Sequence, residues 1–228
     1  MTSLIAAAAF FVLLHLLVSG TRLRSAIVGT IGEGTYMALF SLASLGGIVW
    51  LSMAYGDARG FGETWWDTGA AGRHTALIIQ LIAFLLIIPG LLTPNPTSVK
   101  QEGSLDRPDV ARGMLRITRH PFLWGVAIWA IGHLLVNGDA PSALLFGSLL
   151  ALAIFGTFSI DAKRRKALGP KWEPFATMTS NVPFGAIISR KQKLSLSEIG
   201  WWRILLAVAI WAAVLLGHRY AFGVDPLA

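Results

Sequence analysis

The sequence predicts an all-α fold, a polytopic integral membrane bundle of about six transmembrane helices. Hydrophobic residues make up 54% of the chain and charged residues only 14%. The apolar residues come in long uncharged runs, each close to the length that crosses a bilayer. We expect residues 1–228 to form one transmembrane domain, because this length leaves no room for a second soluble domain.

The apolar runs define six predicted spans. They are Leu4–Val18, Tyr36–Ala54, Ala76–Leu92, Pro121–Val136, Ser142–Ile160 and Ile204–Leu216. Arg22 and Arg24 follow the first span rather than precede it, which favours an uncleaved anchor over a signal peptide. Pro89 predicts a kink or an end in the third span. Glycines within the spans predict close helix packing. These are Gly46, Gly47, Gly125, Gly132, Gly147 and Gly156.

The net charge of +7 is concentrated in alternate loops. Basic residues gather after the first span, between the third and fourth spans, and between the fifth and sixth. The positive-inside rule places these loops in the cytoplasm. The protein is then expected in the cytoplasmic (inner) membrane, with both termini on its outer side. Attraction to anionic lipid headgroups accounts for the basic excess. The predicted partner is therefore the lipid bilayer, and no nucleic acid is expected.

Interfacial segments flank the predicted spans. Trp65, Trp66, Trp201 and Trp202 are expected at the headgroup level, which suits their amphipathic rings. Pro174–Thr179 and Ser197–Trp201 are predicted to lie along the inner surface as short amphipathic helices.

Several classes of chemistry have no motif in this chain. Cysteine is absent, which excludes disulfides, thiolate ligation of haem and cysteine catalysis. No Walker loop, zincin motif, nucleophile elbow or dinucleotide fingerprint occurs. Ion translocation is disfavoured, because it needs a chain of ionisable groups across the bilayer and the spans hold no carboxylates.

His15 lies among leucines inside the first span, where its imidazole needs a polar partner. One interpretation is structural, with a hydrogen bond to Ser19 or to a carbonyl of a neighbouring helix. The other is functional, with His15 as an axial ligand or a substrate contact. Neutral imidazole is the commonest metal ligand in proteins, so both interpretations stay open.

A second polar group stands at the start of the fourth span, where Arg119 and His120 precede Pro121. His133 lies 13 residues after His120, roughly 20 Å further along the same helix. Arg116 and Asp161 come from the flanking inner loops. The helix N-terminus and the arginine charges suit an anionic ligand. Alternatively, the arginines reach lipid phosphates and Asp161 pairs with a neighbouring arginine. Those neighbours are Arg164 and Arg165.

A set of motifs over most of the chain identifies it as a member of the NnrU family. The motifs are His15 with Ser19-Gly20, Arg119-His120-Pro121 with Trp124-Gly125, Gly132-His133-Leu134-Leu135 with Asn137-Gly138-Asp139, Ile160-Asp161 with Arg164-Arg165, Phe175, Thr179-Ser180, Pro183-Phe184 and Glu198-Ile199-Gly200-Trp201-Trp202-Arg203. NnrU proteins are associated with nitric oxide and nitrite reduction in denitrification. The family is also similar to 15-cis-ζ-carotene isomerases, which carry haem b in a membrane bundle.

The resemblance to the isomerases implies haem b with His15 as a ligand, and isomerase-like chemistry on a lipophilic small molecule. The isomerases carry paired histidines before a Phe-Gly pair, but here Leu152-Ala153-Ile154 precedes Phe155-Gly156. We therefore predict His120 as the second ligand and keep His133 as the alternative. The haem propionates are expected to pair with basic side chains. These are Arg112, Arg116 and Arg119.

A second resemblance implies a different cofactor. Arg119–Pro121 and Gly169–Phe175 resemble segments of isoprenylcysteine carboxyl methyltransferases, which hold S-adenosylmethionine at the cytoplasmic face. The acidic pair of that group is reduced here to Asp161. The sequence thus leaves open a haem protein of nitrogen-oxide or redox metabolism, a methyltransferase-like enzyme, and a non-enzymatic assembly factor for a membrane reductase.

Overall fold

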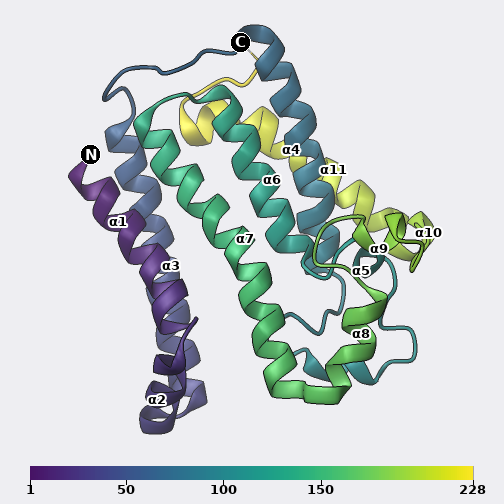
Figure 1. The fold of residues 1–228 in the computed structure, drawn as a ribbon. Coiled ribbons are helices and arrows are strands. Elements are labelled where there is room, and N and C mark those ends of the chain that lie inside the picture. Colours follow the sequence, from purple (N-terminus) through teal and green to yellow (C-terminus); the bar gives the residue numbers. More distant parts are fainter. Residues whose placement is uncertain (228) are drawn as a thin grey trace. The chain divides into compact units, whose positions relative to one another are not determined.

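The computed structural model describes residues 1–227, and all regular secondary structure in this range is helical (Figure 1). The chain divides into two compact units. The first unit comprises Met1–Gly69 and His133–Leu152, and the second comprises Ala70–Gly132 and the chain from Ala153 onward. The all-α prediction is confirmed, and the single domain stays a prediction.

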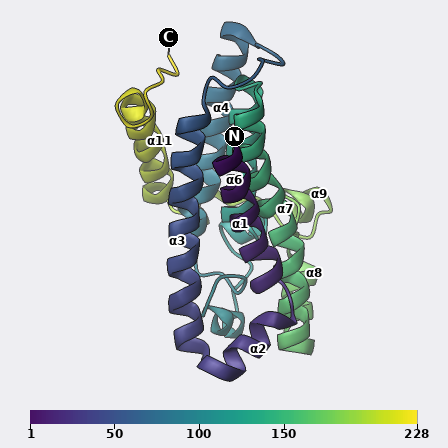
Figure 2. The same cartoon turned by 90° about the vertical axis from the view of Figure 1, so that its left-hand side faces the viewer.

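The first unit begins with an antiparallel pair of helices. Its elements are α1 (Thr2–Leu13), the π-helical turn η1 (Leu14–Val18), α2 (Arg22–Ile31) and α3 (Glu33–Ala58). Helix α1 packs along α3 (Figures 1 and 2). The indole N–H of Trp50 donates to Ser3 Oγ at 3.1 Å, and the Phe10 ring lies against Trp50. The chain bends by 80° between η1 and α2.

The rest of the chain contains longer apolar helices and several short helical segments. The elements are α4 (Gly69–Leu91), η2 (Glu102–Asp106), α5 (Met114–Ile117), α6 (Pro121–Val136), α7 (Ala140–Leu168), η3 (Gly169–Lys171), α8 (Trp172–Met178), α9 (Gly185–Ile188), α10 (Leu196–Ile199) and α11 (Trp201–Phe222). Helices α6 and α7 each contribute residues to both units.

Each predicted span coincides with a helix, but the helices differ in length. Four are long and apolar enough to cross a membrane, and the bent pair Thr2–Val18 and Arg22–Ile31 raises this number to five. Helix α6 has 16 residues and is about 24 Å long, which is shorter than the hydrocarbon core of about 30 Å. Pro89 lies two residues before the end of α4, as its missing N–H predicts.

Helix α7 is longer than the predicted fifth span. It continues past Ile160 to Leu168 and has 29 residues, or about 44 Å. This length exceeds the thickness of the hydrocarbon core, so its charged last turns extend beyond the span that hydropathy predicts. Asp161 therefore stays on the helix, and the rigid helix sets its position.

Close packing between α4 and α6 depends on glycine. A Cβ on Gly125 would lie 3.0 Å from the Ala83 carbonyl oxygen and 2.5 Å from the Ile87 side chain. The predicted role of Gly125 is thus confirmed. Gly46 and Gly147 face open space, so their predicted packing role is wrong. Three further predicted glycines face neighbouring side chains. These are Gly47, Gly132 and Gly156.

The two predicted surface helices differ from the expectation in detail. Helix α8 begins at Trp172, and its Trp172 and Phe175 side chains are buried against Leu115. The predicted helix Ser197–Trp201 is interrupted at Gly200, which has a φ of 90° and separates α10 from α11. This conformation strongly favours glycine, so the glycine ends one helix and lets the next begin in a new direction.

Candidate functional site

A buried polar cluster surrounds the Asp161 carboxylate in the second unit. His120 Nε2 lies 2.8 Å from Asp161 Oδ1, and Arg119 Nη2 donates to Oδ2 at 2.7 Å. Asn181 Nδ2 donates to Oδ2 at 3.1 Å. The His120 side chain is 1% exposed, and those of Arg119 and Asp161 are 10% and 14% exposed. A carboxylate buried to this degree needs such partners to offset its lost hydration.

The local sequence before α6 brings His120 into this cluster. Thr118 ends α5 in an extended conformation and donates its hydroxyl to the Asn181 carbonyl. The backbone N–H of His120 donates to Thr118 Oγ1 at 3.2 Å. Pro121 then occupies the first position of α6, where its missing N–H has no cost. The segment Arg119–Pro121, which the sequence predicts to form a site, is thus held by Thr118 before it and by helix α6 after it.

Arg119 is held by protein groups on each of its nitrogen atoms. Its Nε and Nη2 donate to Asp161, while Nη1 donates to the carbonyls of Ala176 and Thr179 at 3.1 and 3.0 Å. The Arg119 carbonyl accepts from Asn95 Nδ2 at 2.9 Å and from Thr97 Oγ1 at 3.1 Å. A ligand anion would therefore have to displace an existing partner of Arg119.

These contacts decide the charge of Asp161. Burial alone would raise the pKa of the Asp161 carboxyl. Hydrogen bonds with His120 and Arg119, together with the guanidinium charge, outweigh burial and hold that pKa well below its usual range. The ionised carboxylate can only accept, so His120 donates its Nε2–H to Asp161 Oδ1.

A separate latch joins Arg116 to Glu198. Arg116 Nε and Nη2 donate to the two carboxylate oxygens at 2.7 and 2.8 Å, and the Gly113 N–H donates to Glu198 Oε2 at 2.9 Å. The Arg116 hydrogen bonds lower the pKa of Glu198 to about 2, against the opposing effect of burial. Gly113 has a φ of 55°, and a Cβ there would lie 3.0 Å from the Glu198 carbonyl oxygen. Glycine is therefore needed where α5 meets α10.

His15 belongs to the first unit and occupies a different environment. Its Nδ1 lies 2.8 Å from the Phe11 carbonyl oxygen, four residues earlier in the same helix. The ring is flanked by Phe11 at 4.4 Å and Phe40 at 5.3 Å between centroids. The carbonyl can only accept, so Nδ1 carries the hydrogen and the lone pair of the neutral ring lies on Nε2. The expected partners, Ser19 or a neighbouring helix, are replaced by a carbonyl of the same helix.

The comparison with known proteins agrees with the motifs. The profile of the NnrU protein family matches residues 3–226. The chain belongs to the NnrU family. It is also similar to the chloroplastic 15-cis-zeta-carotene isomerases of Zea mays and Arabidopsis thaliana, at 30% and 28% identity over 169 residues. The match covers 72% of this chain but only 45% of each isomerase, so the chain spans less than half the length of these relatives. No solved structure matches.

The structure brings some residues of the NnrU motifs together and separates others. Arg119, His120 and Asp161 form one cluster, while Arg116 pairs with Glu198. His133 stacks on Phe146 in the first unit, with ring centroids 4.5 Å apart. The roles of His15, His120 and His133 as ligands stay predictions.

The predicted pairing of Asp161 with Arg164 or Arg165 is wrong. Arg164 instead donates to Glu102 and to the Ser98 carbonyl, which ties the loop after α4 to α7. Arg165 pairs with Glu173 at 2.8 Å, and both side chains are more than half exposed. Asp161 pairs with Arg119 and His120, which reach it from the start of α6, and not with the arginines that are nearer in the sequence.

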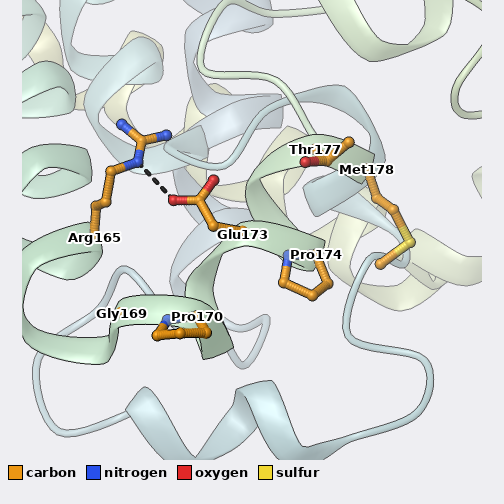
Figure 3. Close-up of a pocket in the computed structure, with 7 residues that line it drawn as sticks. All are labelled: Arg165, Gly169, Pro170, Glu173, Pro174, Thr177 and Met178. Carbon is orange, nitrogen blue, oxygen red and sulfur yellow. Dashed lines mark hydrogen bonds and ion pairs between the residues drawn. The ribbon is translucent and has the colours of Figure 1, made fainter.

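An open hollow of about 700 Å³ lies beside the Arg165–Glu173 pair (Figure 3). Its lining residues are Arg165, Gly169, Pro170, Glu173, Pro174, Thr177 and Met178. The Gly169–Phe175 segment that resembles the methyltransferase motif thus forms much of this surface. Arg119 and His120 do not line it.

Proposed function

We propose that this NnrU protein binds haem b through His15 and acts as an isomerase-like membrane protein on a lipophilic substrate, within nitrogen-oxide or redox metabolism. The observation that carries this proposal is the Nδ1 hydrogen bond from His15 to the Phe11 carbonyl. Histidines that ligate metals usually donate their other ring N–H to a carbonyl or carboxylate. The bond fixes the tautomer and leaves Nε2 free to ligate.

His120 meets the same requirement with the opposite nitrogen. Its Nε2 is held by Asp161 at 2.8 Å, so a neutral ring would offer Nδ1 as the ligating atom. The second ligand stays a prediction, because His120 is 1% exposed within the second unit and the ring of His133 stacks on Phe146 in the first.

The surroundings of His15 also suit a large apolar cofactor. Phe11 and Phe40 present aromatic rings to the imidazole, and η1 is a π-helical turn, a feature found often at functional sites. Bound haem would supply an iron centre able to exchange electrons or polarise a substrate. Phe11 and Phe40 would exclude water from the ligand bond, and the Phe11 carbonyl would keep the ring in the ligating orientation.

Haem content tests this proposal. The purified full-length protein should show a Soret band, and His15→Ala should lose most of it. His218→Ala is a matched control, because His218 Nδ1 also pairs with a backbone carbonyl, that of Val224 at 2.9 Å, beside a phenylalanine ring. A wild-type protein without a Soret band after haem reconstitution, or a His15→Ala protein with an unchanged spectrum, would refute the proposal.

The second candidate function is S-adenosylmethionine binding at the hollow of Figure 3. The hollow favours it because the Gly169–Phe175 segment forms its wall. Calorimetry with S-adenosylmethionine on haem-free protein should then detect binding. Thr177→Trp, which fills the hollow from α8, should abolish it. Absence of binding to the wild-type protein would retire this candidate.

A further inference from the structure

A second hollow, of about 400 Å³, lies beside the latch that joins Arg116 to Glu198. Its lining residues are Arg116, Arg190, Lys191, Gln192, Lys193, Ser195 and Glu198. The hollow is formed by the turn between α9 and α10, and α10 leads directly into the apolar helix α11 (Figure 1). Neither His15 nor the residues of the buried Asp161 cluster line this hollow.

The charge of the hollow is strongly positive. Arg116 and Glu198 neutralise each other across 2.7 Å. Over residues 1–227, no carboxylate forms an ion pair with Arg190, Lys191 or Lys193. Three exposed cations within four residues therefore face the same small volume without a protein counter-charge.

The backbone holds these cations together. The N–H of Lys191 donates to the Ala186 carbonyl at 2.9 Å, and the N–H of Gln192 donates to the same oxygen at 3.0 Å. Arg190 has a φ of 59°, which closes the turn after α9. Gln192 also accepts from Arg116, so the turn is fastened to the latch. The cations are thus presented by a fixed turn.

Exposed apolar side chains flank this basic turn along the chain. Ile188 is 79% exposed, and Leu194 and Leu196 are about half exposed. Trp201 and Trp202 follow at 62% and 58% exposure, at the start of α11. Water disfavours such a patch, whereas the boundary between lipid headgroups and acyl chains suits cations and apolar groups at the same depth.

We propose that the basic hollow binds the headgroup of an anionic phospholipid. Arg190, Lys191 and Lys193 hold the phosphate, and the acyl chains lie along Leu196 and Trp201. Charge complementarity selects an anionic lipid over a zwitterionic one. The apolar rim favours a lipid over a free phosphate, because a small anion would leave the rim exposed to water.

The test compares lipid binding by two variants with the same change in charge. The first is the triple variant Arg190→Gln, Lys191→Gln and Lys193→Gln. The control is Lys100→Gln, Arg107→Gln and Lys166→Gln, which are exposed, carry no ion pair within the part of the chain that the structure describes, and lie outside the hollow. Each set contains one residue with positive φ, Arg190 and Lys100. Binding is measured by native mass spectrometry of the delipidated full-length protein with phosphatidylglycerol or phosphatidylcholine.

Phosphatidylglycerol should bind the wild-type protein and the control variant with affinities within about twofold, and the hollow variant about tenfold or more weakly. Phosphatidylcholine should bind all three weakly. Leu196→Gln keeps every charge and should also weaken phosphatidylglycerol binding, which tests the proposal even if the triple variant misfolds.

Three results would overturn the assignment. Equal losses in the hollow and control variants would mean that diffuse charge attracts the lipid. Equal binding of both lipids to the wild-type protein would remove the role of the cations. Full competition by inorganic phosphate, together with unchanged binding by Leu196→Gln, would indicate a site for a free anion.

Discussion

His15 and His120 are both tied through one ring nitrogen, but their surroundings differ. His120 is 1% exposed and bonds to a carboxylate that also binds Arg119 and Asn181. His15 is only partly buried, bonds to one carbonyl of its own helix and otherwise contacts aromatic rings. His120 is part of a network that spans α6, α7 and the turn after α8, whereas His15 is held by a hydrogen bond within its own helix.

This difference suggests that His120 stabilises the fold, whereas His15 is available to bind a ligand. Removing one member of the Asp161 cluster leaves the others buried with unmet charge, so the cluster is expected to hold its part of the fold rigidly. His15 can change its contacts at the cost of one hydrogen bond. A side chain that must accept a bulky cofactor is better placed in an environment like that of His15.

The largest effect is expected from Asp161→Asn. The substitution removes the counter-charge of Arg119 while both side chains remain buried. Loss of one partner of a buried ion pair costs about 3 to 5 kcal/mol. Denaturant unfolding in detergent should therefore show a large loss of stability. Glu173→Gln breaks an exposed pair with Arg165 and should cost less than about 1 kcal/mol. Equal effects of the two substitutions would contradict the distinction between buried and exposed pairs.

The packing between α4 and α6 predicts the next largest effect. Gly125→Ala would place a methyl group 3.0 Å from the Ala83 carbonyl oxygen and should destabilise the protein by about 1 to 3 kcal/mol. Gly147 is the control, because its Cβ position is open. Gly147→Ala should be neutral or stabilising by up to about 1 kcal/mol, since alanine favours the helix. Thermal unfolding of both variants would check the opposite signs.

The sequence predicts the helices better than their contacts. Each of the six apolar runs falls on a helix, because burial in lipid requires continuous hydrophobicity, but only four or five of these helices are long and apolar enough to cross a membrane. The same signal misplaces the end of α7, since the helix continues after hydropathy falls at Asp161. Hydropathy also cannot distinguish a packed glycine such as Gly125 from an open one such as Gly147, because that depends on the neighbouring helix.

The polar site was predicted only in part for a similar reason. The sequence singles out Arg119, His120 and Asp161, which do meet. It does not predict that Asn181 completes the cluster or that Glu198 pairs with Arg116, because these partners lie 20 and 82 residues away in the chain. The available signal was Glu198 itself, one of two glutamates, with Glu173, in the basic loop between the fifth and sixth predicted spans.

The latch between Arg116 and Glu198 predicts a smaller, pH-dependent effect. The pKa of Glu198 is lowered to about 2 in the folded protein, below its ordinary value of 4.5. The latch therefore stabilises the fold fully above pH 4.5, and this stabilisation is lost as the pH falls towards 2. Glu198→Gln should cost about 1 to 2 kcal/mol at pH 7 and much less at pH 3. The difference in unfolding free energy between the two proteins measures this, and Glu63→Gln in an exposed loop is the control. A difference that stays constant with pH would mean that the ion pair is not its source.

The smallest effect on stability is expected from His15→Ala, and this makes it the most informative about function. The substitution removes one local hydrogen bond and two ring contacts, at a cost below about 1 kcal/mol in haem-free protein. His120→Ala should cost several times more, because Asp161 and Arg119 remain buried without it. With haem present, the stability difference between the wild-type protein and His15→Ala should become large, since a ligand that binds only the folded state adds stability that grows with its affinity. The melting temperature of wild-type protein should therefore rise on haem addition, while that of His15→Ala should not. Strong destabilisation of haem-free His15→Ala would instead mean that the main role of His15 is to stabilise the fold.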